Sequence, residues 1–216
     1  TIYGISSVIS ERDLVERIYE IKQRDRSKPF IILIPDKDAL IKFGISEELI
    51  AKTSKYWPGR NTLIFELENQ SVCEKYLYLH RGKNSLGFRV PDIPELVGLL
   101  EAVGPIVSTS ANISTSKHVT SVEEAKRVFG GTLDFYLDVG ELEGSPSSVY
   151  KFVDGSITVL REQKRYFIFL CSNFGFLYVY SRCEMSLNPS IVQESFLYSN
   201  FVTPVLFVLK ISLHLR

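Results

Sequence analysis

Several residue types on which whole classes of protein depend are scarce in this sequence. Its 216 residues include three cysteines, three histidines, one methionine and one tryptophan. The cysteines form no CxxC pair and no zinc-ligand spacing, so we expect free thiols in a reducing compartment. The histidines stand apart, without a serine or carboxylate at the spacing of a catalytic triad. These absences argue against a metal enzyme and a triad hydrolase.

No charge of one sign predominates either. Lysine plus arginine and aspartate plus glutamate both number 25, so the formal net charge is zero. A protein with a dominant nucleic-acid surface normally carries a basic excess, so this balance allows only a local basic patch. The sequence has no Walker loop, no GxGxxG and no apolar run of the roughly 20 residues that span a bilayer. We therefore expect a cytoplasmic protein that does not cross a membrane.

Apolar residues recur with the periods of helices and strands along residues 1–163. The pattern predicts helices at 10–24, within 36–57, at 94–102 and at 121–130. It predicts strands at 28–36, 61–68, 85–90, 105–110, 133–140, 147–153 and 156–162. Ser10 and Ser121 are the expected helix caps, and Gly44, Gly104 and Gly130 the expected helix ends. Strands that alternate with helices predict an α/β protein, and the neighbouring strands at the end indicate a mixed sheet.

The character of the sequence changes near residue 163. Residues 164–216 hold half of the 14 phenylalanines, two of the three cysteines and the one methionine, with few charges and no clear period. This tail is compatible with an unusual extra element, a membrane-surface segment or translation past a lost stop or frame, and we favour the last. At the other end, the chain opens on Thr1 rather than Met, and we expect the natural start to lie upstream.

Two groups of polar residues follow predicted elements. In "GPIVSTSAN", the side chains of Ser108, Ser110 and Asn112 either close a turn or hold a ligand at a strand end. Lys22 and Arg24 lie at a helix exit, where cations either favour the helix dipole from a solvated face or form a fork for phosphate.

Arginines end two of the predicted strands. Arg89 lies late in an apolar strand, which fits a structural ion pair and a carboxylate-binding role equally well. Arg161 ends a strand of the last pair, and alone it is compatible with an ordinary hairpin.

Taken in order, six segments resemble the YrdC/TsaC family, the threonylcarbamoyl-AMP synthases. "TIYGI" is similar to the end of the family's "PTDTVYGL", and "IKQRDRSKPFIILI" to its KxR segment. "YWPGRNTLIFE" resembles "WPGPLTLVL", and "LGFRVPDIP" resembles "AVRVPDHP". "VSTSAN" resembles "PSAN", and "SPSSVYKF…VLRE" resembles "PSTVVD…ILRPG". The resemblance runs from Thr1 to about Arg161.

The resemblance implies an α/β fold, a YrdC-like twisted mixed sheet with flanking helices around a concave anion-binding cavity. This domain would occupy residues 1–163 and lack the family's first strand and helix. The implied enzyme, a nucleotidyltransferase, joins L-threonine, bicarbonate and ATP, with Mg²⁺, into threonylcarbamoyl-AMP and releases pyrophosphate. A downstream threonylcarbamoyl transferase would use the product to modify tRNA, and weak binding of tRNA is compatible with this role.

The resemblance also implies two sets of site residues. The set expected to bind ATP is Lys22, Arg24, Lys28, Ser85, Ser110, Asn112 and Arg161. The set expected to bind L-threonine is Thr1, Arg89, Ser108 and Ser148. Thr109 is expected only to shape the turn, and no protein side chain is expected to bind a metal.

Two other functions remain open at this stage. The first is a non-catalytic YrdC-like module that binds nucleotide or RNA without making the adenylate. The second is a carbamoyl-transfer enzyme that uses a related domain. That enzyme family adds an acylphosphatase domain and zinc-finger modules, and this sequence has no CxxC pair to supply the latter.

Overall fold

A computed structural model describes residues 1–153, 156–163, 167–170 and 177–180. The chain divides into two units, the first of which contains residues 1–162 and the second of which begins at Gln163. In the second unit, β8 (Phe167–Leu170) pairs antiparallel with β9 (Leu177–Tyr180). Our interpretations of the remaining tail lie outside the described residues. Within those residues, no helix has the length and apolar character needed to cross a membrane.

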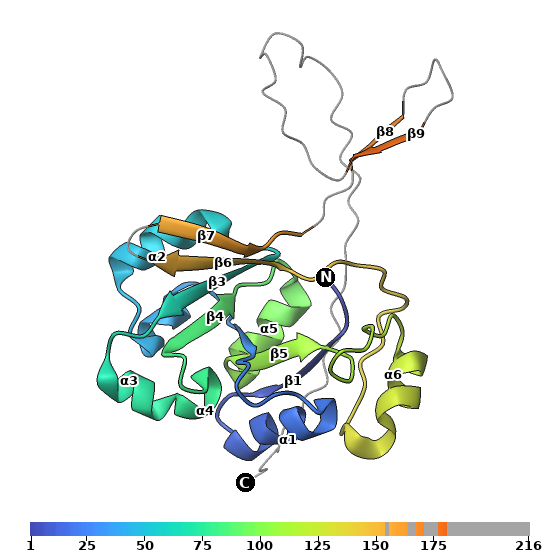
Figure 1. The fold of residues 1–216 in the computed structure, drawn as a ribbon, viewed down its shortest axis with the longest axis horizontal. Coiled ribbons are helices and arrows are strands. Elements are labelled where there is room, and N and C mark those ends of the chain that lie inside the picture. The colour runs from blue at the N-terminus through green and yellow to red at the C-terminus, as the bar shows by residue number, and fades with distance from the viewer. Residues whose placement is uncertain (154–155, 164–166, 171–176, 181–216) are drawn as a thin grey trace. The chain divides into compact units, whose positions relative to one another are not determined.

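The first unit is built on one mixed sheet in the order β1-β5-β2-β4-β3-β6-β7, with β7 and β1 at its two edges (Figure 1). The strands are β1 (Gly4–Val8), β2 (Ile31–Leu33), β3 (Asn61–Glu66), β4 (Ser85–Arg89), β5 (Ile106–Ser110), β6 (Ser148–Val153) and β7 (Ser156–Arg161). The pairs β2–β4 and β3–β6 are parallel, and the other four pairs are antiparallel. The predicted mixed α/β fold is confirmed.

Helices connect these strands, and several of their ends are set by the predicted residues. The α-helices are α1 (Arg12–Lys22), α2 (Glu47–Thr53), α3 (Gln70–Lys75), α4 (Leu77–His80), α5 (Pro94–Val103) and α6 (Val122–Phe129). The 3-10 helices are η1 (Asp38–Phe43), η2 (Ser54–Tyr56) and η3 (Gly130–Thr132). The Ser121 hydroxyl accepts from the Glu124 amide at 3.2 Å, as an N-cap should. Gly104 and Gly130 end their helices at φ of 81° and 52°, a region that glycine enters without strain.

Two sequence predictions are wrong, and two short helices were not predicted. The strand predicted at 133–140 is irregular chain, because the side chain of Asp138 and the amide of Gly140 form a local turn at 2.9 Å. Ser10 is not a cap, since α1 begins at Arg12 with Glu11 in the N-cap position. The helices α3 and α4 were not predicted. They contain six and four residues, which is too short to display a helical period.

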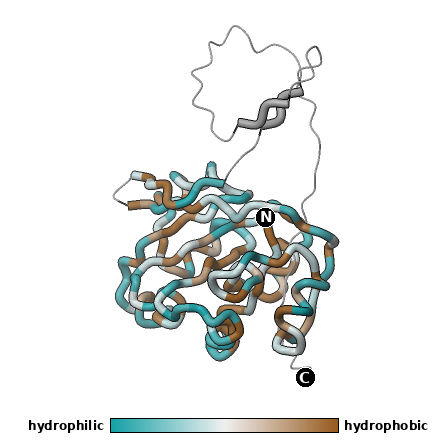
Figure 2. Tube along the Cα trace, turned by 45° about the vertical axis from the view of Figure 1, so that its right-hand side comes forward, coloured by the Kyte–Doolittle hydropathy of each residue, from teal (hydrophilic) through white to brown (hydrophobic). Residues whose placement is uncertain are grey.

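The two faces of the sheet differ in character. Register pairs place Ile32, Leu63 and Phe88 on one face, where they join the main core. Figure 2 shows the central strands as mainly hydrophobic and the outer turns as mainly hydrophilic. On the other face, α5 packs over Leu33 and Ile106 in a smaller core. Beyond α5 that face carries polar side chains, and there the sheet is hollowed.

Candidate functional site

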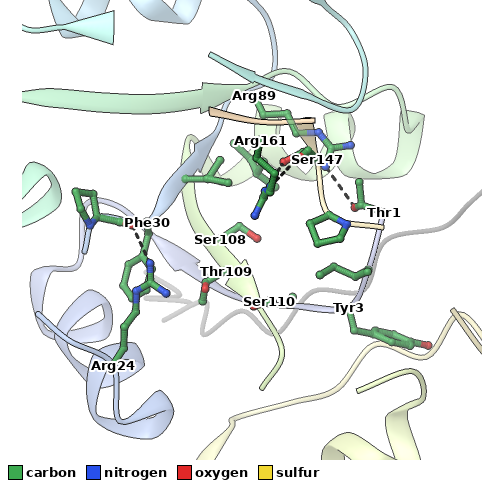
Figure 3. A pocket seen from close by; sticks show the side chains of 16 residues that line it. Thr1, Tyr3, Arg24, Phe30, Arg89, Ser108, Thr109, Ser110, Ser147 and Arg161 are labelled. Atoms are coloured by element: carbon green, nitrogen blue, oxygen red, sulfur yellow. Dashed lines mark hydrogen bonds between the residues drawn. The ribbon is translucent and has the colours of Figure 1, made fainter. Parts of the chain in front are cut away.

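A cavity of about 200 Å³ lies on the same face of the sheet as α5, beyond the part that α5 covers. Its polar lining consists of Arg24, Arg89, Arg161, Thr1, Ser108, Thr109, Ser110 and Ser147, and its main apolar lining of Pro29, Phe30, Ile31, Leu33 and Pro146. Figure 3 shows arginines from separate elements around the hydroxyl run of β5. Among the described residues that line the cavity, three are arginines and none is acidic. The arrangement is therefore suited to an anionic ligand.

The hydroxyl groups reach the cavity because of strand alternation in β5. Ser108 and Ser110 are two residues apart, so their side chains share one face of the sheet. Ser108 pairs with Ile31 on one side and Ser6 on the other, and the Ser6 hydroxyl donates to the Ser108 hydroxyl at 3.1 Å. Gly4 lies opposite Ser110, and a Cβ at Gly4 would lie only 3.1 Å from the Ser108 oxygen. The site thus occupies the sheet face, whereas the sequence indicated only a strand end.

Arg89 approaches the cavity from the end of β4 with most of its side chain buried. Its Nε donates to the Gly59 carbonyl at 2.7 Å, and its Nη1 donates to the Thr1 hydroxyl at 3.3 Å. Its Nη2 is buried without a hydrogen-bond partner in the described structure, and the Asp92 carboxylate lies 3.9 Å away. Burial lowers the pKa of Arg89 to about 10, which leaves it charged at neutral pH. A buried, unsatisfied guanidinium nitrogen is well prepared to accept an anionic partner.

Arg24 enters the cavity from the turn after α1. Its Nε and Nη2 donate to the carbonyl oxygens of Lys28 and Pro29, each at 3.2 Å. Its guanidinium carbon lies 5.2 Å from the centre of the Phe30 ring, a distance typical of a cation–π contact. Burial also lowers the pKa of Arg24. These contacts hold the Arg24 guanidinium in the cavity wall through two carbonyl oxygens and an aromatic ring.

Arg161 comes from the end of β7 and is held by the residue before β6. Its Nε donates to the Ser147 carbonyl at 2.9 Å. The Ser147 hydroxyl shares a buried hydrogen bond of 2.9 Å with the Thr62 hydroxyl on β3. Burial lowers the pKa of Arg161 as well. Ser147, which directly precedes β6, therefore bonds to both β3 and β7 and so helps to fix the position of the Arg161 guanidinium.

Lys22 lies behind the cavity rather than in its lining. The side chain is buried, and Nζ donates to the carbonyl oxygens of Ser110 and Asn112 and to the Asn112 side-chain oxygen. The Ser110 hydroxyl donates to the same Asn112 oxygen at 2.6 Å. The Asn112 amide nitrogen donates to the carbonyl oxygens of Ile113 and Ser116. An ammonium has three donors, so this network uses them all and holds the loop after β5.

The structure brings only part of the predicted site together in the cavity. The predicted residues in the lining are Thr1, Arg24, Arg89, Ser108, Ser110 and Arg161, while Lys22 and Asn112 stand directly behind it. The carbonyl oxygen of Lys28 accepts hydrogen bonds from the side chains of Tyr19 and Arg24, and the Lys28 side chain is exposed. Ser85 begins β4, four residues before Arg89, which is about 13 Å along a strand. The roles of all the predicted site residues toward ATP and L-threonine stay predictions.

Ser147, Thr109 and Phe30 are among the lining residues that were not expected to belong to the site from the sequence. Ser148 is buried at the start of β6, and its neighbour Ser147 lines the cavity instead. Thr109, expected only to shape a turn, also belongs to the lining. Phe30 lies in the run that predicted β2, where an aromatic residue signals packing as readily as a binding site. Period-2 alternation would have favoured one of the two serines, but it does not say which one.

The fold and this cavity together define an α/β protein with an anion-binding site on the face of a mixed sheet. A model of the Sua5/YciO/YrdC family, described as "Telomere recombination", matches residues 1–163. The chain belongs to this family. The match is consistent with the motifs because it includes every predicted site residue.

Several relatives in sequence have names that refer to one activity. A protein of Methanocaldococcus jannaschii is 32% identical over 164 residues, which is 75% of each chain. A threonylcarbamoyl-AMP synthase of Marinobacter nauticus is 31% identical over 161 residues, 71% of this chain and 82% of that one. A threonylcarbamoyl-AMP synthase of Bacillus subtilis is 28% identical over 152 residues, which is 69% of this chain and 42% of the relative. The chain thus spans less than half of that longer relative.

Solved structures of the family share the fold. A double variant of Sua5 from P. abyssi aligns with a TM-score of 0.64 and 25% identity, over 75% of this chain and 52% of that one. E. coli YciO aligns with a TM-score of 0.62 and 25% identity, over 74% of this chain and 82% of that one. A further P. abyssi Sua5 structure, solved in complex with L-threonine, is 24% identical, with a TM-score of 0.60 over 74% and 50% of the two chains.

Proposed function

We propose that this chain synthesises L-threonylcarbamoyl-AMP from L-threonine, bicarbonate and ATP and releases pyrophosphate. One observation carries the proposal. Three arginines and a run of hydroxyl groups surround a cavity in which no described lining residue is acidic. All three substrates bring negative charge, so a site for their reaction needs cations and neutral donors before anything else. The names of the family's synthases support the same conclusion.

Arg89 is the proposed partner of the L-threonine carboxylate. Its buried Nη2 is unsatisfied within the described structure, and a carboxylate oxygen would supply the missing acceptor. The hydroxyls of Thr1 and Ser108 line the same cavity and would accept the polar groups of the amino acid. Gly59 holds the guanidinium from behind, which limits the entropy lost when the ligand binds.

Arg24 and Arg161 are the proposed partners of the ATP phosphates. Both are anchored through Nε to backbone carbonyl oxygens, so they are oriented before the nucleotide arrives. The Ser110 hydroxyl lines the same cavity, and its hydrogen bond to the Asn112 side chain fixes its orientation. Lys22 and Asn112 would act through that loop by holding it in place, since their polar groups contact it already. The assignments of Lys28, Ser85 and Ser148 to substrate are not supported by contacts with the cavity.

The reaction requires positioning more than an activated protein nucleophile. The amino nitrogen of threonine attacks the carbon of bicarbonate, whose hydroxyl group leaves as water with a proton from the amine, or attacks CO2 and releases a proton. Either route yields a carbamate. A carbamate oxygen then attacks the α-phosphorus of ATP, and the bond to the departing pyrophosphate breaks. The arginines would neutralise the charge that these steps bring together. We propose that Mg²⁺ enters with ATP, since Mg²⁺ is usually held through substrate phosphates and only one or two carboxylates.

The product would feed a downstream transferase that modifies tRNA, with at most weak contact between this chain and the tRNA. A cytoplasmic location also stays a prediction. The decisive test measures pyrophosphate release from Mg-ATP with both L-threonine and bicarbonate, and with each one left out. Release that requires both, together with transfer of labelled bicarbonate carbon into an AMP adduct, is the expected result. ATP binding without such release would favour the nucleotide-binding module instead and would overturn the proposal.

A further inference from the structure

A second hollow, of about 690 Å³, lies outside the proposed active site. It is bounded by the turns at 35–37 and 57–58, the loop at 90–94 and one side of α5. Its apolar surface consists mainly of Trp57, Pro58, Val90, Ile93 and Val97. We call this hollow the α5 groove. It is more than three times the volume of the anion-binding cavity, and the proposed chemistry makes no use of it.

Exposed acidic residues surround the apolar floor of the α5 groove. Asp36, Asp92 and Glu101 line it, together with one cation, Lys37. Asp36 uses one oxygen to accept from the Ala39 amide at 2.9 Å, which leaves its charge at the surface. Asp92 faces the Arg89 guanidinium at 3.9 Å, so Asp36 and Glu101 against Lys37 give the apolar groove its excess of negative charge. That combination repels nucleic acid and anionic lipid and attracts a basic partner.

Gly98 gives an independent reason to regard the groove as a binding surface. It lies in the interior of α5, where glycine costs about 1 kcal/mol relative to alanine. Apart from its chain neighbours and the backbone of its own helix, no described atom lies within 4 Å of the position that a Cβ would take, and its φ is not in the left-handed region. Neither packing nor backbone conformation therefore requires glycine here. What the missing side chain does provide is open space on the side of α5 that lines the groove.

We infer that the α5 groove is a docking site for a segment of a partner protein that presents apolar side chains flanked by lysine or arginine. The apolar side chains would cover Trp57 and Val97, and the cations would pair with Asp36 and Glu101. The absence of a side chain at Gly98 would let the partner backbone approach α5 closely. This inference is independent of the proposed synthase activity, because none of these residues lines the anion-binding cavity.

The groove and the anion-binding cavity share a wall. Trp57 and Pro58 line the groove, and the next residue, Gly59, accepts the Arg89 Nε–H at 2.7 Å. The Gly59 amide donates to the Val90 carbonyl at 2.9 Å, and Val90 also lines the groove. A partner in the groove would thus contact the outer side of the segments that hold Arg89.

The experiment uses the full chain and the fluorescence of Trp57, the one tryptophan in the sequence. The probe is a synthetic peptide of sequence GKKLLKKG without aromatic residues, and the control peptide is GEELLEEG. We expect the lysine peptide to change Trp57 emission saturably, with weaker binding at high salt, and the glutamate peptide to have no effect. Absence of a saturable change with the lysine peptide, or an equal response to both peptides, would overturn the inference.

Two variants localise the binding to the groove. Gly98→Leu fills the open space and should weaken binding of the lysine peptide by about tenfold or more. Glu101→Lys reverses one charge and should weaken it by about threefold to tenfold. Thermal unfolding of each variant checks that the fold is intact, and Lys75→Glu on α3, outside the groove, is the matched surface control. Unchanged affinity in Gly98→Leu would contradict the inference. Self-association of the chain that Gly98→Leu abolishes would also contradict it, because the occupant would then be a second copy.

Discussion

Arg89 donates its Nε–H to the carbonyl oxygen of Gly59, 30 residues away along the chain, at 2.7 Å. The bond joins the end of β4 to the turn before β3 and aims the rest of the guanidinium at the cavity. Because the Gly59 amide in turn donates to the Val90 carbonyl, the turn and the strand end hold each other. The "WPG" segment at 57–59 thus has a specific role in placing a cation.

The first prediction concerns the shape of that cation. Arg89→Lys keeps the charge but lacks the planar fork, so it cannot hold the Gly59 carbonyl and a carboxylate together. We expect KM for L-threonine to rise by about 30-fold to 100-fold, equivalent to about 2–3 kcal/mol, with a smaller change in kcat. Steady-state kinetics of pyrophosphate release measures both. Arg26→Lys, an exposed residue outside the cavity, is the control. An unchanged KM would exclude Arg89 from L-threonine binding.

The second prediction tests the phosphate side of the cavity. Arg24→Ala removes a guanidinium that two carbonyl oxygens hold in place. Adenylate formation should fall by about 100-fold to 1,000-fold, because transition-state charge loses its compensation. The melting temperature should change little, since the side chain is not part of the core. Arg26→Ala is the matched control, and wild-type rates in Arg24→Ala would refute the phosphate-binding role.

The third prediction uses the pH dependence of stability. Burial, and to a lesser extent the charge of Arg24, lowers the pKa of Lys22 from 10.5 to about 7. Between these values the unfolded chain binds more protons than the folded chain, so the contribution of Lys22 to the free energy of unfolding increases with pH. The stability of the wild type relative to Lys22→Met should therefore rise from about pH 7 upward. Urea denaturation at several pH values measures this difference, with Lys28→Met as an exposed control. A difference that does not vary with pH would show that the Lys22 pKa is not lowered.

The fourth prediction concerns the hydroxyl group of Ser147. Loss of the hydroxyl in Ser147→Ala leaves Thr62 without its buried partner and loosens the anchor of Arg161. We expect a loss of about 1 kcal/mol in the free energy of unfolding and a severalfold rise in KM for ATP. A double-mutant cycle with Thr62→Ala should give a coupling energy of about 0.5–1 kcal/mol. Strict additivity of the two substitutions would mean that the hydrogen bond contributes nothing.

The sequence predicted the parts of the site that depend on order along the chain. Arg89 and the serines of β5 stand out because they lie late in apolar runs, and Arg24 because it lies at a predicted helix exit, whereas Arg161 was assigned to the site only through the family resemblance. Six such segments in the order of one family also predicted the mixed sheet. Those features are local, so a single sequence displays them.

What the sequence did not reveal depends on contacts between distant segments. Nothing in the residues around Lys22 shows that its ammonium meets carbonyl oxygens 88 and 90 positions later. The strand predicted at 133–140 has apolar residues in a strand-like order, but its polar groups bond locally, with the Tyr136 hydroxyl donating to the Gly130 carbonyl and the Gly140 amide to the Asp138 side chain. The choice between Ser147 and Ser148 depends on where β6 begins relative to β3, which is a matter of register.

The wall shared by the α5 groove and the anion-binding cavity imposes a thermodynamic reciprocity. If a partner segment in the groove shifts the turn at Gly59, it changes the affinity of Arg89 for its anionic ligand by some factor. The same ligand must then change the affinity of the partner segment by that factor, because the two binding free energies share one coupling term. The GKKLLKKG affinity measured with and without L-threonine would give that term directly, and its sign would tell whether substrate recruits the partner or releases it.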